Sequence, residues 1–237
     1  MVFDPSKFTA PAAKPLPVVL LLDISGSMSG DKIRNLNLAV EEMIASFASQ
    51  EKMETQILFS AITFGDGVEL HTPYTPASQV QWRPLTASGL TPMGEALERA
   101  KAMIEDKNIT PSRAYRPVVV LVSDGRPTDS WTQPLATFIG QGRSAKCDRM
   151  AMSIGRDADD AVLGRFVENT AHPLFYAENA SRLHEFFRLV TMSVTLRSVS
   201  ANPNAVPTPE QIALDGGSVQ SATAGVSVTD ADDNNYW

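Results

Sequence analysis

Three short segments that are apolar at nearly every position constrain the fold most strongly. They are residues 18–22, 57–64 and 118–122, the last of which reads VVVLV. A strand that is apolar on both faces has to be covered on both sides, as in a parallel sheet that lies between two layers of helices. Each run is too short to cross a bilayer. The sequence therefore predicts a buried, mostly parallel sheet in a chain without a membrane-spanning segment.

Segments with helical periodicity alternate with these strands. Helical faces are predicted at residues 33–47, 93–104 and 183–190, and further strands at residues 150–154 and 174–176. Only Gly65, Asp66 and Gly67 separate the second strand from residues 68–74, so this segment should pair back as an antiparallel edge strand. The order of elements predicts an α/β, doubly wound, Rossmann-like sheet, mostly parallel with one antiparallel edge strand and with helices on both faces.

The two ends of the chain differ in composition from its middle. We expect residues 1–14 to form a loose arm, residues 15–197 to form one domain and residues 198–237 to form a disordered acidic tail. The tail has five acidic residues and no lysine or arginine, so it carries −5 of the net charge of −7. The nearly neutral remainder, without a basic run, argues against nucleic acid or an anionic membrane as the main partner.

Cysteine content bears on the compartment. The single cysteine, Cys147, cannot form an intramolecular disulfide, which fits a reducing environment. The N-terminal residues contain no apolar core after a basic head, so they do not resemble an export signal. We therefore expect a cytoplasmic protein in which Cys147 is a small core residue.

The first apolar strand runs directly into three oxygen-bearing side chains, those of Asp23, Ser25 and Ser27. One carboxylate and two neutral hydroxyls in a tight loop are suitable ligands for a hard divalent cation. Serine, glycine and aspartate also cluster in ordinary turns, so this pattern alone permits a purely structural interpretation. Its meaning depends on what the other strands bring to the same edge.

Two further segments place oxygen ligands at that edge. Asp124 follows the strongest strand, and Gly125 allows a sharp turn after it. Thr91 precedes Pro92, and a proline at the first helical position predicts that Thr91 is the helix N-cap. Ligands of open α/β sheets bind beyond the carboxyl ends of the strands. The three segments together therefore predict one cation site.

The motifs DISGS, GLTPMG and VSDG, in this order, resemble the metal-ion-dependent adhesion site (MIDAS) of the von Willebrand factor type A domain family. PVVLLLDISGSMSGDKI, ASGLTPMGEAL and LVSDGRPTD together are most similar to its bacterial tellurium-resistance-associated branch. The resemblance covers about residues 15–197, and Leu90 stands where relatives often have a second glycine. It implies five ligands: the hydroxyls of Ser25, Ser27 and Thr91, and the carboxylates of Asp23 and Asp124, acting directly or through water.

This ligand set favours binding over catalysis. Mg²⁺ takes octahedral oxygen ligands at roughly 2.0 to 2.1 Å and usually keeps several waters, so an Asp or Glu of a protein partner could complete its shell. Mn²⁺ could substitute. We therefore expect a Mg²⁺-dependent protein-interaction module without enzyme activity. The resemblance implies a role in stress response and tellurium resistance, with kinase, phosphatase or chaperone-like partners.

Two alternatives remain open from the sequence. A Mg²⁺-dependent phosphoryl-transfer enzyme could use Asp23 as nucleophile, but it would need a second acid nearby, and Ser25 occupies the obvious position. The acidic tail could also reach back and offer the site a carboxylate of its own, from Asp230, Asp232, Asp233 or the C-terminus. A solvated tail is the simpler interpretation of the same residues.

Overall fold

The computed structural model describes residues 13–50, 55–155, 158–208 and 211, and these form a six-stranded sheet in the order β3-β2-β1-β4-β5-β6. Neighbouring strands run parallel except for β2 and β3, which are antiparallel. The strands are β1 (Lys14–Asp23), β2 (Thr55–Gly65), β3 (Gly67–Pro76), β4 (Val118–Ser123), β5 (Asp148–Ile154) and β6 (Leu174–Ala177). The mostly parallel sheet with one antiparallel edge strand confirms the predicted fold class.

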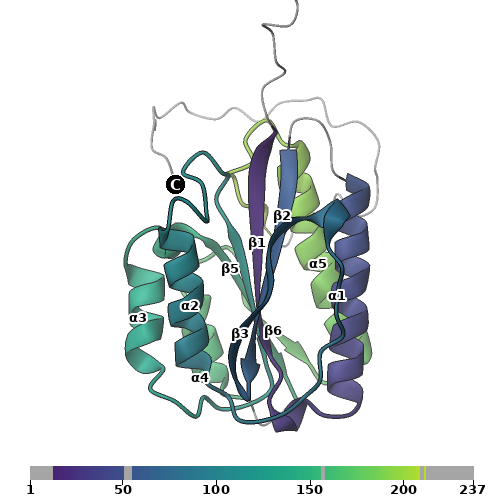
Figure 1. Ribbon diagram of the computed structural model, residues 1–237, viewed down its shortest axis with the longest axis vertical. Helices are drawn as coiled ribbons and strands as arrows, with labels where there is room; N and C mark the ends of the chain where they lie inside the picture. The colour runs from purple at the N-terminus through teal and green to yellow at the C-terminus, as the bar shows by residue number, and fades with distance from the viewer. Residues whose placement is uncertain (1–12, 51–54, 156–157, 209–210, 212–237) are drawn as a thin grey trace, which may run out of the picture.

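Helices cover both faces of the sheet, as Figure 1 shows. One face carries α1 (Asp31–Gln50) and α5 (Ala180–Val199), and the other carries α2 (Met93–Glu105), α3 (Thr132–Gly140) and α4 (Asp160–Phe166). Short 3-10 turns are η2 (Gly26–Met28), η3 (Ala77–Gln79) and η4 (Ser144–Lys146). Among the residues that the structure describes, no helix combines the length and apolar character that a membrane crossing requires.

The central strands are buried on both faces because their side chains alternate between two cores. Leu20 and Leu22 of β1 belong to the core beneath α1 and α5, whereas Val19 and Leu21 belong to the core beneath α2, α3 and α4. All four side chains have no exposed surface. Each such burial stabilises the fold by about 1.5–3 kcal/mol. Continuous apolar runs are therefore what this position in the sheet requires.

The parallel pairing brings the ends of two chain-distant strands together. In the register of β1 and β4, Leu22 lies opposite Val122, so Asp23 and Ser123 follow side by side at the carboxyl edge of the sheet. The chain turns sharply after each strand, into η2 after β1 and into the loop before α3 after β4. This shared edge is where the sequence predicts the cation site.

At the amino end of β5, opposite the carboxyl ends where the cation site is predicted, an aspartate is buried beside an arginine and a histidine. Asp148, the first residue of β5, lies 3.5 Å from the Arg197 guanidinium of α5 and 3.3 Å from Nε2 of His172. All three side chains are at most 1% exposed. Burial lowers the pKa of Arg197 to about 10, although the nearby Asp148 opposes this effect. The carboxylate therefore compensates a cation that has lost its water.

Candidate metal centre

Asp23 closes β1 and is held by hydrogen bonds on both carboxylate oxygens. The backbone N–H of Ser25 donates to Oδ1 at 2.8 Å, and the hydroxyl of Ser123 donates to Oδ2 at 2.5 Å. Burial raises the pKa of the Asp23 carboxyl, the hydrogen bonds from Ser123 and Ser25 oppose that rise, and the Asp124 carboxylate adds to it. A negative charge in this dry position calls for a nearby cation.

The remaining hydroxyls of the first loop connect to the second carboxylate. Oγ of Ser25 and Oγ of Ser27 are 3.0 Å apart, and Ser27 donates to Oδ1 of Asp124 at 2.7 Å. Asp124 and Asp23 have no exposed surface, whereas Ser27 is exposed. The loops that follow β1 and β4 thus meet in one polar cluster, with Ser27 at its solvent-facing side.

Thr91 reaches the cluster from the loop before α2. This loop is tied to the loop after β4: the Thr91 N–H donates to Oγ1 of Thr128, and the Thr128 N–H donates to the Thr91 carbonyl, both at 3.0 Å. Our prediction that Thr91 caps the helix was wrong. The Asp129 carboxylate accepts the N–H groups of Gly94 and Glu95 at 3.0 and 2.9 Å. Because Asp129 caps α2, the Thr91 hydroxyl is not needed there.

Gly125 shows how closely the ligands converge. A Cβ on this glycine would lie 3.2 Å from Oγ1 of Thr91, 3.8 Å from Oγ of Ser27 and 3.9 Å from Oδ2 of Asp23. Three of the five predicted ligands therefore surround one small space, and the other two, Ser25 and Asp124, are hydrogen-bonded to Ser27. The hard oxygens of these residues suit Mg²⁺ or Mn²⁺, so the donor set fits a divalent cation.

The ligand set is mixed in character. Within the described ranges, no group of three or more histidine, cysteine, aspartate or glutamate side chains could hold a metal ion. A cation at this edge therefore depends on hydroxyls as much as on carboxylates. Two carboxylates balance a divalent charge and leave no excess negative charge, so a further anionic ligand can still be accepted.

Replacing Gly125 with alanine should weaken divalent-metal binding at least about tenfold, because the methyl group would enter the space between Thr91, Ser27 and Asp23. The φ angle of Gly125 is not positive, so alanine is compatible with the backbone. Isothermal titration with Mg²⁺ measures the effect. Gly140→Ala is the matched control, since its Cβ would meet nothing within 4 Å. Equal Mg²⁺ affinity in Gly125→Ala and the natural chain would contradict this placement of the ion.

Lys32 is an unpredicted member of the site. Its ammonium lies 2.5 Å from Oδ2 of Asp124, on the side away from Ser27, and its side chain is 35% exposed. The Lys32 side chain also lies close to Gly155, just after β5, because an added Cβ there would be 3.7 Å from Nζ. The chain thus brings a cation of its own to one of the two carboxylates.

Three further residues were missed by the sequence reasoning: Lys32, Ser123 and Asp129. Ser123 had a readable signal, because a serine that ends an otherwise apolar strand beside Asp124 calls for a polar partner. Lys32 and Asp129 had none, because their partners lie 92 and 34 or 35 residues away in the chain. Such contacts depend on the tertiary fold.

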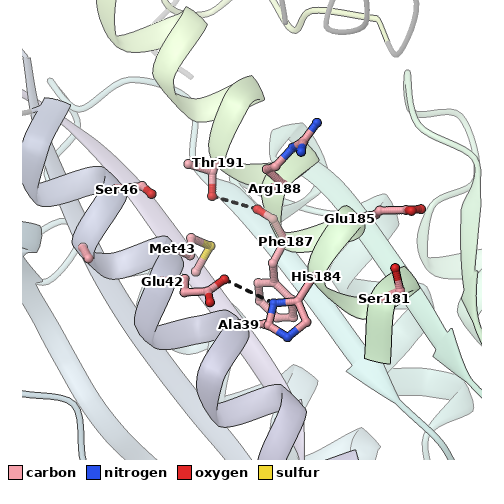
Figure 2. A pocket seen from close by; sticks show the side chains of 11 residues that line it. Ala39, Glu42, Met43, Ser46, Ser181, His184, Glu185, Phe187, Arg188 and Thr191 are labelled. Carbon is pink, nitrogen blue, oxygen red and sulfur yellow. Dashed lines mark hydrogen bonds and ion pairs between the residues drawn. The ribbon is translucent and has the colours of Figure 1, made fainter. Parts of the chain in front are cut away.

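A large groove lies elsewhere on the molecule. A cavity of about 640 Å³ runs between α1 and α5, where His184 lies 3.2 Å from Glu42 and the Thr191 hydroxyl donates to the Phe187 carbonyl at 2.7 Å (Figure 2). None of the five predicted ligands lines this cavity. The candidate metal centre lies instead at the carboxyl ends of β1 and β4.

Comparisons with known proteins agree with this architecture. The von Willebrand factor type A domain family profile matches residues 18–189, whereas no curated protein matches the sequence. A von Willebrand factor type A structure from Catenulispora acidiphila superposes with a TM-score of 0.60 at 18% identity, covering 76% of this chain and 43% of that one. The ArnB paralog VWA2 from Sulfolobus acidocaldarius gives a TM-score of 0.57 at 15% identity, covering 77% and 46%.

Another similar structure carries a metal in the same class of motif. It is that of proximal thread matrix protein 1 from the mussel byssus, described as having a zinc-occupied MIDAS motif. It superposes with a TM-score of 0.59 at 15% identity, covering 76% of this chain and 48% of that one. The chain spans less than half the length of each of these three structures. At these identities the likeness shows the fold alone.

Proposed function

Because the chain belongs to the von Willebrand factor type A domain family, we propose that it is a Mg²⁺-dependent protein-binding module whose metal ion accepts an Asp or Glu carboxylate of a partner. Domains of this family commonly mediate metal-dependent protein–protein interactions. The ion supplies a Lewis-acidic position for the incoming carboxylate. The residues of this chain orient that position and hold it at the surface.

The convergence of ligands around Gly125 carries this proposal. Thr91, Ser27 and Asp23 all lie within 4 Å of one point, although Thr91 comes from the loop before α2 and the other two come from the end of β1 and the loop after it. Ser27 is exposed, so the space is open to a partner on that side. A site with two carboxylates and three hydroxyls leaves a hard octahedral ion short of one ligand, which a partner's carboxylate can provide. Mn²⁺ would serve in place of Mg²⁺.

An apolar side chain stands next to this opening. Leu90, the residue before Thr91, is 67% exposed. A partner that places a carboxylate on the ion would cover Leu90 and gain hydrophobic burial there. The proposed interface therefore combines one charged contact with an adjacent apolar contact.

The biological setting is proposed from motif resemblance. The combination of DISGSMSGDKI, SGLTPMGEAL and VSDGRPTD supports a bacterial role in tellurium resistance and stress response, and the single cysteine supports a cytoplasmic location. Kinase, phosphatase or chaperone-like proteins of the same stress response are the proposed partners. A phosphoryl-transfer role for Asp23 is less well supported, because both of its oxygens accept internal hydrogen bonds and the residue has no exposed surface.

A pull-down from a lysate of the source organism tests the proposal, with the purified chain as bait in Mg²⁺ or in chelator. We expect partners that are retained in Mg²⁺, released by chelator and lost with Ser27→Ala bait. Leu90→Ser bait should retain its metal affinity but recover less partner. Recovery that is the same with and without Mg²⁺ would contradict the proposal.

Lys32→Met should tighten divalent-metal binding about two- to fivefold, because the natural ammonium competes with the metal for Asp124. The pair is partly exposed, so the gain is modest. Lys32→Arg, which keeps the charge, should leave the affinity close to that of the natural chain. Titration calorimetry of the three proteins decides the matter. Weaker binding in Lys32→Met would instead assign Lys32 a supporting role in the metal centre.

A further inference from the structure

A polar pocket lies at the amino end of β5, at the opposite end of the strands from the candidate metal centre. Its volume is about 310 Å³, and its charged lining residues are Arg116, Lys146, Asp148 and Arg149. We call it the basic pocket. β5 has seven residues and runs from the basic pocket to the carboxyl ends of the strands, so about 20 Å separates the two ends of the sheet. The basic pocket is therefore independent of the metal ligands.

Arg149 is buried, and within the described part of the chain no ion pair joins its guanidinium to a carboxylate. Its guanidinium donates to three backbone carbonyls, those of Phe166 at 2.7 Å, Ala145 at 3.0 Å and Glu168 at 3.0 Å. These neutral acceptors satisfy its hydrogen bonds but leave its positive charge uncompensated. The residue is only 4% exposed, so solvent screens that charge poorly.

The one acid of the pocket already serves other groups. Asp148 contacts Arg197 and His172, so its single negative charge already compensates Arg197 and cannot fully balance Arg149 as well. Arg116 adds a further cation, whose Nε is buried and has no hydrogen-bond partner among the described residues. Three arginines and Lys146 thus gather around one carboxylate. Buried charges in proteins are normally paired, so this excess predicts an anion.

We propose that the basic pocket binds an oxyanion, either a phosphate or a carboxylate. Arginine guanidiniums match the planar, multiple acceptor oxygens of these groups better than a single-atom ion such as chloride. Lys146 is exposed at the rim, where its ammonium can meet the anion as it enters. The buried Arg149 and the half-buried Arg116 then hold it, and partial exclusion of water strengthens the charge pairing.

The acidic tail of this chain could itself supply a carboxylate to the basic pocket. The beginning of the predicted tail is bound near the basic pocket: the Arg116 N–H donates to Oδ1 of Asn204 at 2.8 Å, and Nε of Arg197 donates to the Pro203 carbonyl at 2.7 Å. Val206 lines the basic pocket itself. The first acids of the tail, Glu210 and Asp215, follow within a few residues. An intramolecular carboxylate and a free phosphate are thus two sources of one ligand type.

Thermal unfolding in inorganic phosphate tests the site on the full chain. The buffer contains chelator, so that the metal centre cannot contribute, and sodium chloride at equal ionic strength is the reference. We expect phosphate to raise the melting temperature, and Arg116→Gln or Lys146→Gln to weaken phosphate binding at least about tenfold. Arg99→Gln is the matched control, because Arg99 is exposed on α2 and does not line the basic pocket.

A full-length variant shows whether the bound oxyanion is a tail carboxylate or a free anion. In this variant the acidic residues of the tail are changed to the corresponding amides, at Glu210, Asp215, Asp230, Asp232 and Asp233. If a tail carboxylate occupies the pocket, this variant should bind phosphate several-fold more tightly than the natural chain, and Lys146→Gln should abolish the gain. Equal phosphate binding in both chains would assign the pocket to a free anion. The proposal is overturned if neither chain responds to phosphate beyond the chloride reference, or if Arg116→Gln and Lys146→Gln respond as strongly as the natural residues.

Discussion

Asp124→Ala should abolish measurable Mg²⁺ binding, with a loss of more than about 100-fold in affinity, because it removes one of the two carboxylates that balance the divalent charge. It also removes the acceptor of Ser27, so a hydroxyl ligand loses its orientation. Isothermal titration measures the affinity directly. Melting temperatures with and without Mg²⁺ give a second measure, because a ligand that binds only the folded state stabilises it.

The metal-free form of Asp124→Ala separates this effect from misfolding. Asp124 raises the pKa of Asp23, which reflects repulsion between the two carboxylates. Removing Asp124 relieves this repulsion but also removes the acceptor of Ser27 and the partner of Lys32, so the metal-free melting temperature should change little while the response to Mg²⁺ disappears. Asp66→Ala is the control, since Asp66 is an exposed acid in the turn between β2 and β3. Natural Mg²⁺ affinity in Asp124→Ala would exclude the proposed centre.

Asp148→Ala should lower the free energy of unfolding by about 3–5 kcal/mol, the largest stability effect that we expect from one substitution in this chain. The change leaves the Arg197 guanidinium without its carboxylate at a position where both side chains are 1% exposed. An uncompensated buried charge costs far more than a lost surface ion pair. Urea unfolding followed by circular dichroism measures the difference.

A double variant tests the assignment to the buried charge. If Arg197 is the cause, combining Asp148→Ala with Arg197→Met should destabilise the chain less than the sum of the two single changes. Glu98→Ala, on the exposed side of α2, should change stability by no more than about 0.5 kcal/mol. A loss below about 1 kcal/mol in Asp148→Ala would show that the pair is not a significant source of stability.

The fold was predictable because burial on both faces leaves a direct mark on sequence. Residues 118–122 are all apolar, and the structure places them in the centre of the sheet with no exposed surface. The antiparallel edge followed from local geometry, since Gly67, with a φ of +96°, closes the turn into β3. Both signals are contained within short stretches of chain.

The proximity of the two aspartates was predictable for a related reason. Asp23 and Asp124 each follow a recognisable parallel strand, and parallel strands end at the same edge, so their proximity follows from the fold class. The capping of α2 was not predictable in this way. Thr91 and Pro92 have the local pattern of a helix start, but the Asp129 carboxylate, 34 or 35 residues away from the N–H groups it accepts, takes the cap.

The buried contacts of Asp148 at the amino end of β5 could not be predicted from the sequence either. Asp148, His172 and Arg197 lie far apart in the chain and have no shared spacing. Their contact depends on α5 crossing the amino end of β5, which periodicity does not specify. Lys32 belongs to the same class, because only the tertiary fold brings it to Asp124.

The adjacency of β1 and β4 also bears on mechanical force. Asp23 and Asp124 are attached to neighbouring parallel strands that share five registered residue pairs, from Val18 and Val118 to Leu22 and Val122. A partner that pulls on the ion along these strands would load both of them in shear, so many backbone hydrogen bonds would have to break together. We expect such a linkage to withstand tension better than one attached to an edge strand, which can be peeled away one hydrogen bond at a time.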